Sequence, residues 1–82
     1  MTPDQVRRAI ADALGEIAPE AQLERVAPEA ELRHALDLDS VDFLSLLERL
    51  AEQTGIEVPE SAYAQVATLD GLVGYLVSHP GG

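Results

Sequence analysis

The chain of 82 residues contains no cysteine, no tryptophan and no lysine. Without cysteine it has neither disulfides nor thiolate metal ligands, so any thiol that it uses must come from an added group. Its few aromatic residues, Phe43, Tyr63 and Tyr75, cannot form the stacking platforms that bind single-stranded nucleic acids. It has no apolar run of about 18 residues and no secretory signal pattern at its start. We therefore expect no membrane span and a cytoplasmic location.

Basic residues are scarce, and the formal net charge is −10. All five basic residues are arginines, and they stand against 15 acidic residues. This charge repels phosphate backbones and anionic membrane surfaces, which argues against nucleic acid as a partner. It favours encounter with basic protein surfaces, although plain solubility explains it equally well.

The length of the chain allows one small domain, residues 1–82. We expect an ordered core over about 3–78, a tail at 79–82, and a monomer. A domain of this size cannot enclose a large catalytic cavity and still keep a core. Its function is therefore expected at the surface.

The first helix is predicted from its start and stop signals. Thr2 is a suitable N-cap, Pro3 fits the first helical position, and Gln5 completes a capping box. The helix is expected to end near Ala18, because the residue before Pro19 avoids the helical region.

A long connection is expected over residues 18–38, with one helical turn near 29–33. Loops of this length are uncommon inside compact domains and are often functional. Leucine and valine recur through the connection, which indicates that it packs across the other helices.

The strongest helical pattern begins at Ser40, with Asp39 as its N-cap and Gly55 as its stop. One face of this helix carries Phe43, Leu46, Leu47 and Leu50, and another carries Val41, Leu44 and Glu48. A domain this small cannot bury both faces. The second stripe is therefore either a docking surface or a surface that packs under the long loop.

The rest of the chain predicts one or two helical turns over 61–66 and a last helix that begins after Thr68. Gly71 and Gly74 weaken this last helix by about 1 kcal/mol each relative to alanine. The predicted fold is all-α. It is a small antiparallel bundle of three main helices plus one short helix, with a long loop between helices one and two.

Ser40 stands at the start of the strongest helix, between Asp39 and Asp42. Helix capping alone explains serine and aspartate at such a position. A phosphate ester on an exposed serine there would also meet free backbone N–H groups and the positive end of the helix dipole. The residues by themselves do not choose between a structural cap and a modification site.

Two other chemistries fit Ser40 and its neighbours less well. A serine nucleophile needs a base, but His79 lies in the expected tail, and His34 lies in the loop with no evident orienting carboxylate. A calcium loop that starts at Asp37 would need an oxygen ligand at Val41 and glycine at Asp42. We therefore assign no catalytic residue and no metal site.

The segment 39–42, Asp-Ser-Val-Asp, resembles the Asp-Ser-Leu signature of acyl and peptidyl carrier proteins. Residues 44–50 resemble the second helix of that family, 55–59 its acidic link that ends in proline, and 68–76 its last helix. The resemblance covers essentially the whole chain and is strongest over 36–77.

The resemblance implies that Ser40 carries 4′-phosphopantetheine, attached from coenzyme A by a phosphopantetheinyl transferase, and that Asp39 belongs to the motif. The protein would then be a carrier and not an enzyme, and the thiol that it lacks would belong to the cofactor. It would deliver acyl or related thioesters to enzymes of fatty acid, polyketide or related biosynthesis that present basic docking surfaces. The implied recognition face consists of Asp37, Val41, Asp42, Leu44, Glu48 and Glu52.

Two positions depart from the family pattern. Asp37 stands where the family usually has glycine, and Val41 stands where it has leucine or methionine. These departures indicate a specialised, stand-alone bacterial carrier. An aminoacyl or peptidyl carrier and an unmodified acidic adaptor stay open as alternatives. Whether cargo wedges between the helices or stays in solvent is open as well.

Overall fold

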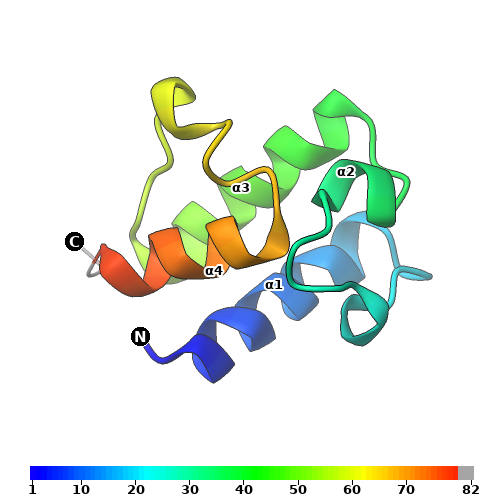
Figure 1. Cartoon of the computed structure of the whole chain (residues 1–82), viewed down its shortest axis with the longest axis horizontal. Helices are drawn as coiled ribbons and strands as arrows, with labels where there is room; N and C mark the ends of the chain where they lie inside the picture. The colour runs from blue at the N-terminus through cyan, green and yellow to red at the C-terminus, as the bar shows by residue number, and fades with distance from the viewer. Residues whose placement is uncertain (80–82) are drawn as a thin grey trace.

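Three long helices form the frame of the molecule in the computed structural model, which describes residues 1–79. They are α1 (Pro3–Ile17), α3 (Ser40–Thr54) and α4 (Leu69–Ser78). Shorter elements, η1 (Leu23–Arg25), α2 (Leu32–Ala35) and η2 (Glu60–Ala62), lie in the connections. In Figure 1, α3 and α4 run opposite to α1, which packs against both. The predicted all-α bundle with a long first loop is confirmed.

The main helices begin and end at the signals that the sequence provides. Thr2 Oγ1 accepts the N–H of Gln5 at 3.2 Å, and Gln5 Oε1 accepts the N–H of Thr2 at 2.9 Å. This pair is the predicted capping box. Asp39 Oδ1 accepts the N–H of Asp42 at 2.7 Å at the start of α3. Gly55 ends α3 in the left-handed conformation, with φ 74°.

One hydrophobic core fills the space between the three long helices. The inward face of α3 supplies Phe43, Leu46, Leu47 and Leu50 to it, as the helical spacing predicts. Val41 and Leu44 are 66% and 39% exposed. The second stripe of α3 is therefore not covered by the long loop. Within residues 1–79, no helix is both long and apolar enough to cross a membrane.

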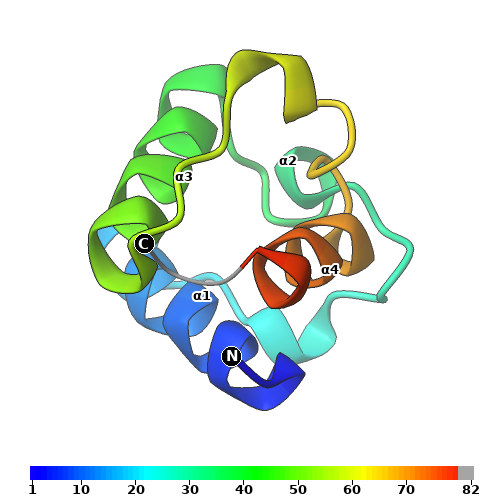
Figure 2. The ribbon, with the colours of Figure 1, turned by 90° about the vertical axis from the view of Figure 1, so that its left-hand side faces the viewer.

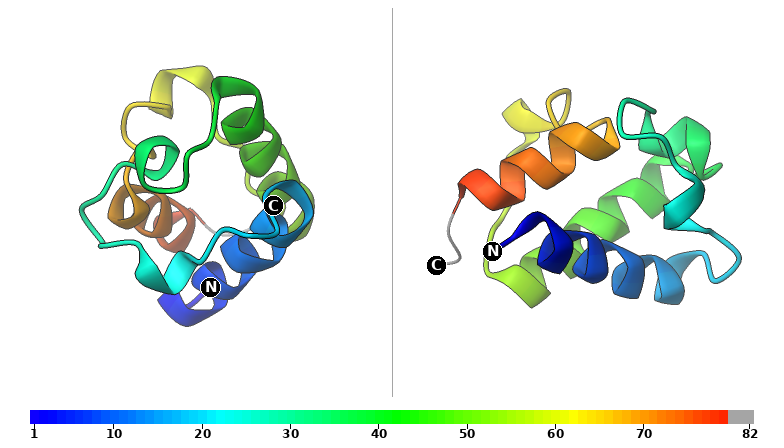
Figure 3. Two further views of the ribbon diagram at one scale, coloured as in Figure 1. Left: turned by 90° about the vertical axis from the view of Figure 1, so that its right-hand side faces the viewer. Right: turned by 60° about the horizontal axis from the view of Figure 1, so that its bottom comes forward.

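The first loop is fastened to the start of α4. Three backbone hydrogen bonds of 2.8–3.2 Å run from the N–H of Leu32 to Ala67, of Leu69 to Ala30 and of Asp70 to Pro28. Two of the donors lie in the first turn of α4, so the loop satisfies N–H groups that a helix start leaves open. Figure 2 and Figure 3 show the loop passing from the end of α1 around α4 to the start of α3.

The prediction of a helical turn at 29–33 is wrong by about three residues, because the turn found there is α2, Leu32–Ala35. Glu31 is extended, with φ −73° and ψ 124°, and forms a bridge with Thr68. The pairing with α4 thus prevents a helix from starting before Leu32. The turns expected over 61–66 are present as η2, followed by turns through Val66. Of the predicted tail, residues 80–82 lie outside the described residues.

Asp37 connects α2 to α3 in the left-handed conformation, with φ 55°. The N–H of Asp37 donates to the carbonyl of His34 at 3.4 Å, and the N–H of Leu38 donates to that of Arg33 at 2.9 Å. This pair of bonds is a Schellman motif, in which glycine usually occupies the left-handed position. Aspartate is one of the few other residues that tolerate this conformation. Asp37 therefore makes a turn of the kind in which glycine is the usual residue.

Gly71 occupies a position in α4 that leaves no room for a side chain. A Cβ atom there would lie 1.9 Å from the carbonyl oxygen of Gln65. At Gly74, by contrast, a Cβ atom would meet no neighbour within 4 Å beyond the helix's own backbone. Glycine therefore lowers the stability of α4 at Gly74 without any packing need, whereas close packing requires glycine at Gly71.

These two glycines give a matched pair of substitutions. We expect Gly74→Ala to raise the free energy of unfolding by about 0.5–1 kcal/mol, since alanine favours the helix. We expect Gly71→Ala to lower it by about 1–3 kcal/mol, because Gln65 must move away. Urea unfolding followed by circular dichroism measures both changes. Shifts of the same sign would contradict the difference in their surroundings.

The left-handed turn at Asp37 gives a second stability prediction. Asp37→Gly should raise the free energy of unfolding by about 0.5–1 kcal/mol, because glycine adopts a positive φ without steric cost. Ala35→Gly, two residues earlier and inside α2, should lower it by a similar amount. Asp37→Asn removes the charge but keeps the side-chain shape, so the change that it causes in thermal unfolding isolates the charge contribution. A destabilising Asp37→Gly would show that the aspartate side chain stabilises the turn.

Candidate functional site

Ser40 is the first residue of α3, and it is exposed. The turn at Asp37 and the N-cap at Asp39 precede Ser40 and place it at the surface. The cap takes the N–H of Asp42, and in residues 1–79 the N–H groups of Ser40 and Val41 have no acceptor. A helix start with free donors attracts negative charge, because the helix dipole is positive at this end. The surroundings of Ser40 thus favour an anionic group on its hydroxyl.

An apolar pocket of about 340 Å³ opens beside Ser40, between α3 and the segment around η2. Its lining consists of Glu31, Arg33, Ser40, Phe43, Leu44, Tyr63, Ala64 and Ala67. A second hollow of about 180 Å³ lies farther along α3, and Leu44 and Tyr63 border it as well. The sequence analysis gave no role to Tyr63 here. In the sequence, only its aromatic side chain within the predicted turns of 61–66 could have drawn attention to Tyr63.

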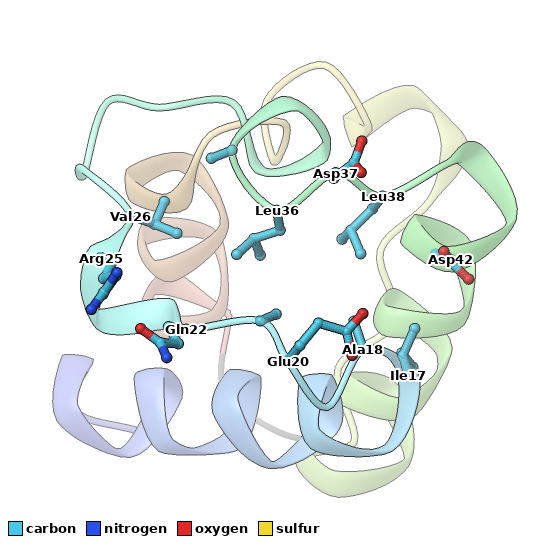
Figure 4. A pocket seen from close by; sticks show the side chains of 12 residues that line it. Ile17, Ala18, Glu20, Gln22, Arg25, Val26, Leu36, Asp37, Leu38 and Asp42 are labelled. Atoms are coloured by element: carbon cyan, nitrogen blue, oxygen red, sulfur yellow. The ribbon is translucent and has the colours of Figure 1, made fainter.

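A larger pocket of about 500 Å³ lies on the other side of the start of α3, between the end of α1 and the first loop. Figure 4 shows Leu36 and Leu38 pointing into it from the segment that follows α2. Asp37 and Asp42 stand at its border with Glu20. Two residues of the predicted recognition face therefore lie beside this pocket.

Most of the predicted recognition face lies on one exposed side of α3. Val41, Leu44, Glu48 and Glu52 are all exposed and lie on one side of the helix. Leu44 and Glu48 also border the hollow on the η2 side. Asp42 is turned towards α1, and Asp37 lies before the helix beside the same pocket. The structure thus brings four of the six residues together and places Asp37 and Asp42 at the pocket near α1.

The charge of this region is strongly acidic. Residues 37–60 contain seven acids and one base, Arg49. Arg49 forms an ion pair with Glu16 of α1. Its charge is therefore balanced by a carboxylate outside α3, and the exposed stripe of the helix carries acidic charge.

The arrangement around Ser40 does not support a nucleophile or a calcium loop. His79 caps the C-terminal end of α4, where its ring stacks on Tyr75 with centroids 3.9 Å apart. Among the described residues, neither histidine forms a hydrogen bond with Ser40. The segment from Ser40 is helical, so it cannot follow the path of a calcium loop. Across residues 1–79, no three His, Asp or Glu side chains are grouped to hold a metal ion.

The residues around Ser40 fit a phosphodiester on its hydroxyl. The free N–H groups of Ser40 and Val41 supply donors, and Arg33 lines the same pocket with a positive charge. The apolar lining between Phe43 and Tyr63 suits the less polar parts of a tethered arm. The donor set and the pocket together match the chemistry of phosphopantetheine.

Comparison with known proteins agrees with this geometry. Residues 4–76 match the family model described as the phosphopantetheine attachment site. The chain is 29% identical to the acyl carrier protein of Cyanidioschyzon merolae, over 93% of this chain and 78% of the relative. It is 37% identical to the acyl carrier protein of Rubrobacter xylanophilus, over 66% of this chain and 67% of the relative.

A third relative, acyl carrier protein 2, mitochondrial, of Arabidopsis thaliana, is 32% identical over 68% of this chain and 44% of the relative. The match to the family model spans the three long helices and the loops that join them. We conclude that the chain belongs to the acyl carrier protein family, as a carrier rather than an enzyme, with 4′-phosphopantetheine as its prosthetic group.

Proposed function

We propose that the phosphopantetheine arm is attached to Ser40 and that the protein carries acyl or related intermediates as thioesters on it. The observation that supports this most directly is the exposed Ser40 hydroxyl beside free N–H groups at the start of α3. Partner enzymes of a fatty acid, polyketide or related pathway would load and unload the cargo, and the first of them is a phosphopantetheinyl transferase. The expectation of a cytoplasmic monomer remains a prediction.

The chain's own residues hold and position the arm, which supplies the thiol that the chain lacks. The N–H groups of Ser40 and Val41 would donate to the phosphate oxygens, and Arg33 would balance the phosphate charge. Asp39 holds the first turn of α3 in place through the N–H of Asp42, so its role is structural. The carboxylates near Ser40 take no covalent part.

The exposed stripe of α3 would be the surface that partner enzymes recognise. Val41 offers an apolar contact one residue after Ser40, and Glu48 and Glu52 offer negative charge along the same stripe. Leu44 adds a second apolar contact on this side, Asp42 extends the surface towards α1, and Asp37 adds a charge before the helix. Long-range attraction would bring basic partner surfaces to this side, and the resulting contacts would be weak and sensitive to salt.

An aminoacyl or peptidyl carrier is the second candidate on this scaffold. The curated relatives described above are all named acyl carrier proteins, which favours acyl cargo. The family match disfavours the unmodified adaptor, because a prosthetic group belongs to this family.

The attachment site is tested by substitution of Ser40. We expect Ser40→Ala to abolish the gain in mass on incubation with coenzyme A and a broad-specificity transferase. The free energy of unfolding should change by less than about 0.5 kcal/mol, because the side chain is exposed. Ser61→Ala, an exposed serine in η2, is the matched control and should load normally. Normal loading of Ser40→Ala, read by intact mass, would refute the attachment site.

The recognition face is tested by charge reversal. The double variant Asp42→Lys with Glu48→Lys should lower kcat/KM of the transferase about tenfold or more at low salt, because attraction to its basic surface is lost. The loss should shrink as salt is raised. Asp12→Lys with Glu24→Lys changes the net charge equally at exposed positions on α1 and η1 and should have a smaller effect. Equal effects of the two variants would show that net charge acts, and not this face.

A further inference from the structure

Arg33 of α2 is the basic residue that borders the pocket beside Ser40. Both residues line this pocket, and both side chains are exposed. Within residues 1–79, the guanidinium of Arg33 forms no ion pair, although Glu31 lines the same pocket. The N–H donors of Arg33 are therefore available to an anion, in a segment where Asp39 and Asp42 make the other nearby charges negative.

The backbone fixes where Arg33 stands relative to Ser40. The carbonyl of Arg33 accepts the N–H of Leu38 at 2.9 Å, which closes the left-handed turn just before Ser40. At the start of α2, the N–H of Leu32 donates to the carbonyl of Ala67 at 2.8 Å. The helix that carries Arg33 is thus fastened to the segment before α4, and a single short turn joins it to the start of α3.

The charges on the two sides of Ser40 differ in sign. On the α1 side, Asp37 and Asp42 border the larger pocket together with Glu20, and their carboxylates repel an anion. On the η2 side, Arg33 attracts one, and its planar guanidinium can donate two parallel N–H bonds to phosphate oxygens. A phosphate group on Ser40 is therefore drawn towards α2.

We infer that Arg33 is a positioning residue, through which the phosphate of the attached arm holds α2 and the first loop against α3. This inference rests on the proposed attachment of the arm to Ser40. Attachment adds a contact between the start of α3 and α2, two elements that are otherwise joined there by the turn alone. A contact made only in the folded state makes local opening rarer, so the loaded protein has a more stable α2 turn than the unloaded one.

The experiment compares the protein before and after it is loaded from coenzyme A, by amide hydrogen exchange and by thermal unfolding. Slower exchange is expected at the N–H groups of Leu36 and Leu38, which bond to carbonyls of α2. At low salt the slowing should be about two- to fivefold, as for an exposed ion pair, and the thermal midpoint should rise by about 1–5 °C. Both changes should shrink as salt is raised, because the contact is exposed and is screened.

Substitutions separate the effect of Arg33 from that of net charge. Arg33→Gln should lose most of both changes, whereas Arg33→Lys, which keeps the charge but not the planar fork, should retain part of them. Arg25→Gln is the matched control. Arg25 is exposed and lines the pocket on the α1 side, and Figure 4 shows it at the end away from Asp42. This control should respond to loading as the unchanged protein does.

Loading is read first, by intact mass. A loaded protein in which exchange at Leu36 and Leu38 is unchanged, or in which Arg33→Gln keeps the full effect, would overturn the inference and leave the carrier function intact. Equal losses in Arg33→Gln and Arg25→Gln would also overturn it, since net charge alone would then explain the effect. Failure to load at Ser40 would instead overturn the proposed function, and the inference with it.

Discussion

The backbone pairing between residues 28–32 and 67–70 is the constraint on which the position of Ser40 depends. It fixes the middle of the long first loop against the start of α4. From that anchor only α2 and the turn at Asp37 separate the loop from Ser40. A loop held by side-chain packing alone would leave the start of α3 less well placed. The pairing thus turns an uncommonly long connection into a rigid support.

The first turns of α3 and α4 differ in where their backbone N–H groups donate. In α4, the N–H groups of Leu69 and Asp70 donate to the first loop, and that of Gly71 donates to Thr68 at 3.0 Å. In α3, the cap takes the N–H of Asp42, and the donors before it face solvent. One helix start therefore holds the fold together. The other leaves the N–H groups of Ser40 and Val41 without an acceptor within residues 1–79, and its positive dipole favours an anionic group there.

Local signals predicted the features of the fold that depend on neighbours in sequence. The starts and ends of the long helices follow from caps, prolines and Gly55, and the inward face of α3 follows from spacing. The position of α2 was missed, because it is set by pairing with a segment more than thirty residues away. Helix propensity showed that Gly71 weakens α4. It did not show that the nearby carbonyl of Gln65 leaves room only for glycine there. Resemblance singled out Ser40, whereas the pocket beside it depends on which elements meet in space.

The ion pair between Arg49 and Glu16 has a consequence for how copies of this protein behave together. Arg49, which is the one basic residue of the segment 37–60, is paired with Glu16 of α1. The outer side of α3 therefore presents negative charges to any second copy. Two copies that approach through this side repel one another within the Debye length, about 8 Å at physiological salt. At a partner's basic surface, one bound carrier would therefore keep the next at a distance until it leaves. The same repulsion disfavours self-association through the outer side of α3.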